Sequence, residues 1–180
     1  GQPAISYYDE TNWDLKYASY DGRKWTPQTI DSEGKVGSHA SLAFNLSGHP
    51  VISYHDVSNQ DRIANADLKY ASYDGQKWTT QTIDREGDVG RYTSLAFSPS
   101  GHPTISYFYW SNMDLKYASF DGQKWTLETI DSEGEVGSHT SLAFSPSGQP
   151  AISYYDSTNK DLKYASYDGR KWTLETIDRE

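Results

Sequence analysis

The sequence contains no cysteine. Neither disulfides nor metal sites with thiolate ligands can therefore hold the fold together, and thiol content says nothing about the redox compartment. Long apolar runs are also missing. No stretch approaches the roughly 18 consecutive apolar residues that span a bilayer, and no charged-then-apolar leader opens the chain. We therefore expect no membrane insertion.

Basic residues are few. Lys and Arg total 16 against 25 Asp and Glu, which gives a formal net charge of −9. Proteins bind phosphate backbones through clustered Lys and Arg, so we expect no nucleic-acid partner. Aromatic residues are plentiful, with six Trp, fifteen Tyr and five Phe, and this composition is typical of a folded globular chain. Because the sequence opens at Gly1 inside a repeat, we expect it to be a processed or excised segment.

Four near-copies of one unit make up the chain. Tryptophan recurs in the same local setting at spacings of 53, 47 and 47 residues, and the second copy carries six extra residues. We expect a single domain over residues 1–180, divided into the repeats 1–47, 48–100, 101–147 and 148–180.

Each unit contains four short runs that alternate in side-chain character. In the third repeat they span 103–108, 114–120, 125–130 and 141–145, and Gly, Pro, Asn or Asp bounds each of them, which is typical of β-strands joined by turns. The connections are short, so neighbouring strands must pair antiparallel as a meander. Both faces of this small sheet carry apolar side chains, so it needs other sheets on both sides.

A radial arrangement packs every such sheet between two others and leaves only short edges, so the sequence predicts an all-β fold of the β-propeller class. The small Ser-Leu-Ala-Phe segments at 41–44, 94–97 and 141–144 suit the innermost strand of a four-stranded antiparallel blade. The first of the four blades lacks that strand, which leaves fifteen strands. Three arrangements stay open: part of a longer propeller, closure as four blades, or pairing with a second copy to make about eight.

The segment ASYDGRKWT at 18–26 recurs in every unit, beginning again at Ala71, Ala118 and Ala165. It resembles the Asp-box of BNR-type repeats in sialidase-like propellers, S-x-D-x-G-x-x-W, and the whole unit is similar to tandem repeats of bacterial sialidase-like proteins. The resemblance implies that the motif lies in the turn between the third and fourth strands of a blade. Here Gly follows Asp directly, one residue earlier than in the family, so the turn geometry differs.

The motif itself predicts a structural role. Asp-Gly is a turn dipeptide, because Asp accepts backbone N–H bonds and Gly supplies positive φ. Burying roughly 200 Å² of indole is worth about 5 kcal/mol at about 25 cal/mol per Å². The predicted structural anchors are Trp25, Trp78, Trp125 and Trp172 with Asp21, Asp74, Asp121 and Asp168.

Ligands of propellers bind where loops converge near the axis. Two sets of loops are expected there, the one that includes 8–14 and the one that includes 31–39, each with its counterparts in the other repeats. Exposed aromatic rings beside Asp and Asn suit carbohydrate, although loop residues of this kind are also common as tolerant, solvated positions. The candidate ligand-binding residues are Asp9, Asn12, Trp13, Glu33, His39, His55, Asp56, Trp110, Asn112, His139, Asp156 and Asn159.

Catalysis is not indicated. Sialidase chemistry, which the resemblance suggests, needs converging arginines and a tyrosine nucleophile. Arg23 and Arg170 instead lie on the Asp-Gly turns, where other repeats have Gln. Glutamates at 128 and 175 match glutamines at 28 and 81, which indicates a solvated outer strand. We assign no catalytic residue.

Metal and cofactor sites are not indicated either. The loop at 31–34 lacks the alternating acidic pattern of an EF-hand, and the histidines do not cluster as zinc ligands do. We expect no cofactor.

These features predict a non-catalytic binding module, lectin-like and secreted or displayed on a bacterial cell, that binds carbohydrate through repeated shallow sites on one propeller face. The alternatives are a structural or protein-interaction scaffold and a sialidase-like glycoside hydrolase. Glycans or another protein are the expected partners, and self-association would complete the propeller.

Overall fold

The computed structural model describes residues 2–58 and 65–179. The loop that carries the six extra residues of the second repeat therefore lies partly outside the described residues. Within the described part, the chain forms fifteen strands. That part contains no helix of the length and apolar character needed to cross a membrane.

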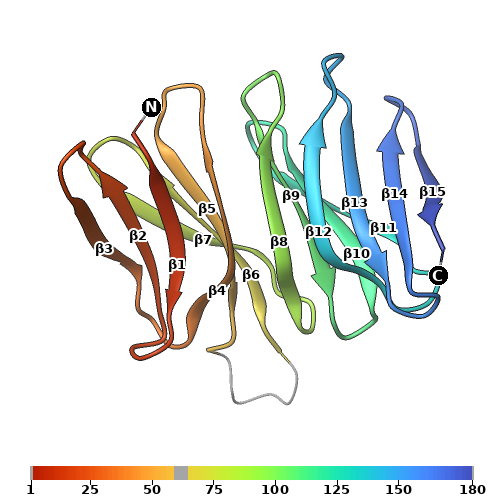
Figure 1. Ribbon diagram of the computed structural model, residues 1–180, viewed down its shortest axis with the longest axis horizontal. Coiled ribbons are helices and arrows are strands. Elements are labelled where there is room, and N and C mark those ends of the chain that lie inside the picture. The colour runs from red at the N-terminus through yellow and green to blue at the C-terminus, as the bar shows by residue number, and fades with distance from the viewer. Residues whose placement is uncertain (1, 59–64, 180) are drawn as a thin grey trace.

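The strands form four antiparallel sheets, and in each sheet consecutive strands pair as a meander (Figure 1). The first sheet contains β1 (Ala4–Asp9), β2 (Asp14–Tyr20) and β3 (Trp25–Asp31). The second contains β4 (Val36–Phe44), β5 (Pro50–Asp56), β6 (Asp67–Tyr73) and β7 (Trp78–Asp84). The third contains β8 (Val89–Phe97), β9 (Pro103–Tyr109), β10 (Asp114–Phe120) and β11 (Trp125–Asp131). The fourth contains β12 (Val136–Phe144), β13 (Pro150–Asp156), β14 (Asp161–Tyr167) and β15 (Trp172–Asp178).

The four sheets stand side by side as propeller blades, with β4, β8 and β12 adjacent along the inner edge. The predicted fold class is confirmed, including the first blade that lacks an innermost strand among the described residues. The sheets form an open arc, with the first and the fourth at its opposite ends (Figure 1). The described residues therefore do not close into a four-bladed ring.

The innermost strand is longer than the sequence predicted. We expected it at 141–145 in the third repeat, but β12 starts at Val136 and passes through two irregularities before Ser141. The bulge hides the alternation on which the prediction rested. Within it, a Cβ atom on Gly137 would lie 2.6 Å from the Cα atom of Leu115 in the preceding sheet, so glycine is required there.

The core lies in the contacts between neighbouring sheets, which we call joints and number one to three along the chain. At the third joint, Leu115 and Tyr117 of the third sheet pack against Ile152, Tyr154 and Ala165 of the fourth. The other two joints repeat this packing with the matching residues. The second and third sheets are therefore sandwiched between two others as expected, whereas the first and fourth each pack against one neighbour.

A buried polar triad crosses each joint. At the second joint, the Asp84 carboxylate accepts hydrogen bonds from Tyr107 Oη at 2.7 Å and from Lys116 Nζ at 2.6 Å. Asp31, Tyr54 and Lys69 repeat the triad at the first joint, and Asp131, Tyr154 and Lys163 at the third.

The Asp31 triad shows the electrostatic balance. Burial would raise the pKa of Asp31, but the hydrogen bonds from Lys69 and Tyr54 outweigh it and hold that pKa below the usual value. Burial and the bond to Asp31 raise the pKa of Tyr54 far above its usual range. At neutral pH the triad is therefore an ionised Asp31–Lys69 pair with a neutral Tyr54 phenol.

Candidate functional site

The arc has two faces. The face that we call the turn face carries the Asp-Gly turns and the turns that follow the inner strands, at the top of Figure 1. The opposite face, the loop face, carries the hairpin loops after β1, β5, β9 and β13 and the links from sheet to sheet. The candidate residues named from the sequence lie on or near the loop face.

Each Asp-Gly turn is held by its aspartate. The Asp168 carboxylate accepts hydrogen bonds from the backbone N–H groups of Arg170 at 2.8 Å and Lys171 at 2.9 Å. These bonds lower the pKa of Asp168, and Gly169 has a φ of 94°. Asp21, Asp74 and Asp121 make the same pair of bonds.

The motif tryptophans are wedged between sheets. The ring of Trp172 lies 5.2 Å from that of Tyr117 in the preceding sheet and 5.4 Å from that of Tyr167 in its own. Trp78 and Trp125 make the matching contacts with Tyr17 and Tyr70. Trp25, at the open end of the arc, is 44% exposed.

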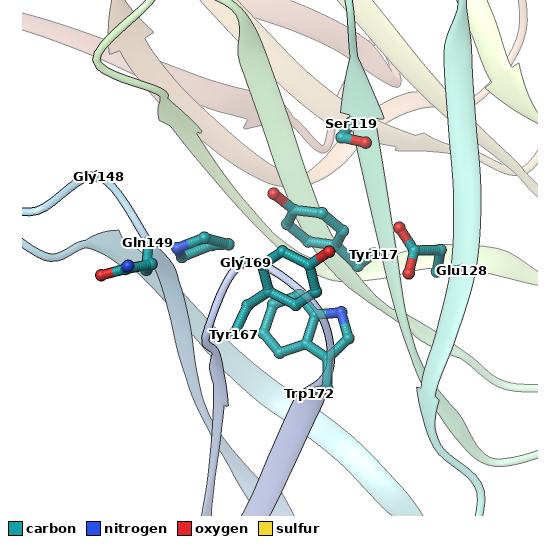
Figure 2. Close-up of a pocket in the computed structure, with 9 residues that line it drawn as sticks. Tyr117, Ser119, Glu128, Gly148, Gln149, Tyr167, Gly169 and Trp172 are labelled. Atoms are coloured by element: carbon teal, nitrogen blue, oxygen red, sulfur yellow. The ribbon is translucent and has the colours of Figure 1, made fainter.

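Beside Trp172, the third joint opens into a pocket of about 290 Å³ on the turn face (Figure 2). We call it the aromatic pocket. One wall comes from β10 and β11 of the third sheet, and the other comes from the fourth sheet. Its lining consists of Tyr117, Ser119, Glu128, Gly148, Gln149, Pro150, Tyr167, Gly169 and Trp172.

The residue before the proline differs between the joints and leaves free space beside Gly169 at the third joint. At the first joint, the imidazole of His49 lies 3.2 Å from the place where a Cβ atom on Gly75 would be. His102 covers Gly122 in the same way at the second joint, at 3.3 Å. At the third joint nothing lies within 4 Å of the matching position on Gly169, because Gln149 replaces the histidine.

The aromatic pocket combines three kinds of group. Trp172, Tyr117 and Tyr167 offer aromatic surface, and Glu128 offers carboxylate oxygens (Figure 2). Figure 2 also shows the indole nitrogen of Trp172 on the side of the pocket that Glu128 occupies. The pocket can therefore receive a small ring with an apolar face and accept hydrogen bonds from its hydroxyl groups.

Several loop-face candidates hold their own loops. The Asp9 carboxylate accepts bonds from Thr11 N at 3.1 Å and Asn12 Nδ2 at 2.8 Å, and it pairs with Lys16 Nζ at 2.7 Å. Asn159 Nδ2 donates to Asp156 at 2.9 Å in the same way. These side chains already have partners, so a ligand would have to compete with the turn.

Two further candidates are buried. His55 lies between Ser38 Oγ at 3.1 Å and the Asp88 carboxylate at 3.2 Å. Asp56 pairs with Lys69 Nζ at 3.3 Å. His55 therefore links the second sheet to the segment before β8, and Asp56 pairs with a lysine of its own sheet.

The histidines of the inner strands lie in an aromatic column. His39, Tyr92 and His139 all have positive φ, and the Tyr92 ring lies 4.6 Å from His39 and 4.3 Å from His139. Desolvation by these neighbours and the charges of His55 and Arg91 lower the pKa of His39 to about 4. His39 is therefore a neutral ring at neutral pH.

Trp110 and His139 come together in a second pocket, of about 190 Å³, on the loop face of the third joint. Asp156 and Asn159 line a separate polar pocket of about 540 Å³ with Glu133 and Asp161. Trp13, Glu33 and Asn112 are exposed outside these pockets. The twelve candidates thus belong to several places and do not form one site.

The aromatic pocket was not predicted. Glu128 lies on a solvated outer strand, as the exchange with glutamine at 28 and 81 indicated, and its exposed side chain also lines the pocket wall. The sequence does carry a signal for the pocket. Where the first joint has Gln28 and His49, the third joint has Glu128 and Gln149, so both positions change together. Among the described residues, no group of three or more His, Asp or Glu side chains is placed to hold a metal ion.

No family model and no curated protein matches the chain. Many solved structures are similar to the chain, and three of them illustrate the shared fold. A protein of unknown function from Dyadobacter fermentans has a TM-score of 0.67 and 13% identity, over 91% of this chain and 58% of its own. A fucose lectin from Kordia zhangzhouensis, solved with methyl-fucoside, has a TM-score of 0.53 and 18% identity, over 78% of this chain and 99% of its own. An N-acetylgalactosamine deacetylase from F. plautii, solved with blood group B trisaccharide, has a TM-score of 0.53 and 11% identity, over 95% of this chain and 68% of its own.

These identities support a shared fold and nothing finer. The chain spans 58% of the Dyadobacter protein, so it matches little more than half of that molecule. By contrast, it matches nearly the whole of the lectin.

Proposed function

We propose that the chain is a non-catalytic carbohydrate-binding module that holds one sugar ring in the aromatic pocket. The observation that carries the proposal is the combination of Trp172, Tyr117 and Glu128 around an open space of about 290 Å³. That volume is near the lower end of the range of small-molecule sites, which suits a monosaccharide. Sugar rings stack their C–H faces on aromatic rings while their hydroxyl groups bond to carboxylates.

The structural neighbours support this chemistry. One whole fucose lectin, solved with methyl-fucoside, shares the fold. The deacetylase, solved with a blood group trisaccharide, shares it too. The second pocket, with Trp110 and His139, would add a weaker contact on the loop face, and repeated weak contacts gain affinity through multivalency.

The test is a glycan array followed by titration calorimetry with methyl-fucoside and the best saccharide of the array. Glu128→Gln and Gln149→His install the residues that the first joint already carries, so both variants should fold. We expect each to weaken saccharide binding by about tenfold or more, because one removes a charged acceptor and the other fills the space above Gly169.

Trp13→Ala is the matched control. Trp13 is 47% exposed on the loop face, and its ring lies 4.3 Å from Lys35 Nζ. The proposal predicts unchanged affinity for this variant. Binding that survives Glu128→Gln and Gln149→His but is lost with Trp13→Ala would move the site to the loop face, and silence across the array would favour the interaction scaffold.

A secreted or cell-surface location and a relationship to Asp-box repeats belong to the same proposal. A lectin meets glycans outside the cell, and the Asp-Gly turns lie between the third and fourth strands of each blade, as in the Asp-box family. Fractionation of the producing cells would check the location.

A further inference from the structure

The two ends of the arc expose residue types that the joints bury. At the first sheet, Ile5 is 48% exposed, whereas the matching Ile52, Ile105 and Ile152 are fully buried. At the fourth sheet, Leu162 is 45% exposed, whereas its counterparts Leu15, Leu68 and Leu115 are fully buried. The fourth sheet therefore presents one half of a joint, and the first sheet presents the other half without the inner-strand residues that match Val136 and Leu142.

The polar groups at the ends are complementary as well. At each joint, the aspartate that ends one sheet binds the tyrosine and the lysine of the next. Asp178 is the matching aspartate of the fourth sheet, and it has no tyrosine or lysine partner in the described ranges. Tyr7 and Lys16 are the matching residues of the first sheet, and there Lys16 turns to Asp9 in its own sheet.

The aromatic contact of each joint, a motif tryptophan packed on a tyrosine of the preceding sheet, is also split between the two ends of the arc. Trp78, Trp125 and Trp172 each pack on a tyrosine of the preceding sheet at 5.2 to 5.4 Å. Trp25 is the motif tryptophan of the first sheet and is exposed. Tyr164 is the matching tyrosine of the fourth sheet. The first sheet thus carries the unpaired tryptophan, and the fourth sheet carries the tyrosine on which it would pack.

We propose that the first sheet of a second copy of this chain docks on the fourth sheet, head to tail, as a further joint. Leu162, Tyr164 and Asp178 of one copy then meet Ile5, Trp25, Tyr7 and Lys16 of the other. This contact joins two different surfaces, so two copies that use both ends close into a ring. Burial of the exposed apolar side chains drives the docking, and the charged pair fixes its register.

The new joint rebuilds the aromatic pocket. Its residues from one copy are Tyr164, Ser166 and Glu175, which match Tyr117, Ser119 and Glu128. Those from the second copy are Gln2, Pro3, Tyr20, Gly22 and Trp25, which match Gln149, Pro150, Tyr167, Gly169 and Trp172. The residue types are identical, and no histidine closes the space. This second saccharide site, which rests on the proposed function, is complete only when two copies meet.

Sedimentation velocity of the chain over a wide range of concentration tests the assembly. We expect a species of about twice 20.3 kDa or a larger whole multiple. Ile5→Asp and Leu162→Asp each spoil one end at a position that is exposed in the single copy, so each variant should fold and sediment as a monomer. Leu46→Asp, at an 80% exposed position away from the ends, should assemble as the parent does.

Mixing the two end variants gives the decisive result. The Ile5→Asp variant keeps an intact fourth sheet and the Leu162→Asp variant keeps an intact first sheet, so the mixture should recover a dimer through one joint. A parent chain that stays monomeric overturns the assembly. Dimerisation of either variant alone, or a mixture that stays monomeric, overturns the head-to-tail arrangement.

Calorimetry separates this inference from the proposed function. At aromatic pockets, the assembled parent should bind two saccharides per chain and the monomeric variants one, beside any weaker binding at the second pocket. Assembly with no saccharide binding leaves the docking intact and overturns the proposed function. One saccharide per chain in a parent that assembles overturns the shared site.

Discussion

At the scale of residues, the buried triads stabilise each joint through charge. The side chains of Asp84 and Lys116 are 2% and 7% exposed, and Tyr107 is fully buried. A buried charge without a partner is costly, so each member depends on the other two. The triad therefore fixes how one sheet sits on the next.

We expect Asp84→Asn to lower the free energy of unfolding by about 3–5 kcal/mol, because the buried Lys116 ammonium loses its counter-charge. Urea unfolding at neutral pH measures the change. Glu86→Gln, two residues away on an exposed side chain, is the control and should change stability by less than about 0.5 kcal/mol. Equal stability of the two variants would show that the triad contributes little.

The turn residues could be predicted from the sequence, but the triads could not. Asp21 and Gly22 form their turn through bonds within four residues, and short-range chemistry of that kind is visible in the dipeptide. Asp84 and Tyr107 are 23 residues apart and lie in different sheets. Their contact depends on how the sheets stack, which strand patterns do not fix.

At the scale of elements, the outer three strands of each blade could be predicted closely. Their side chains alternate and their ends are turns, so observed and expected bounds differ by at most one residue in the third repeat. The inner strand could not, since the bulge before Ser141 breaks the alternation. The aromatic pocket was not predicted for a related reason. It lies between two sheets, and each sheet supplies only half of its lining.

The similarity between the joints predicts that a saccharide pocket can be created at the first joint by substitution. At the first joint, Tyr17, Ser19, Pro50, Tyr73 and Trp78 match the lining of the aromatic pocket. The lining differs at two positions, where Gln28 and His49 replace Glu128 and Gln149.

The double variant Gln28→Glu with His49→Gln should therefore open a pocket there and add one saccharide per chain, measured by calorimetry. His49→Gln alone, which opens the space without the carboxylate, should bind at that joint more weakly. An unchanged number of sites in the double variant would mean that these two positions do not control binding.

At the scale of the whole molecule, repetition makes every joint a variant of one design. The overall class could be predicted because two-sided sheets of one kind must stack around a common centre. The open arc of Figure 1 could not, since the sequence left closure undecided among three arrangements. The structure shows both ends of the arc as unpaired halves of the same joint.

A crystal structure of the chain soaked with methyl-fucoside or the best saccharide of the array would show where the sugar binds. We predict a sugar ring on the turn face of the third joint, stacked on Trp172 with a hydroxyl group bonded to Glu128. Density for the sugar beside Trp13 or Trp110 on the loop face, with the aromatic pocket empty, would contradict binding at the third joint.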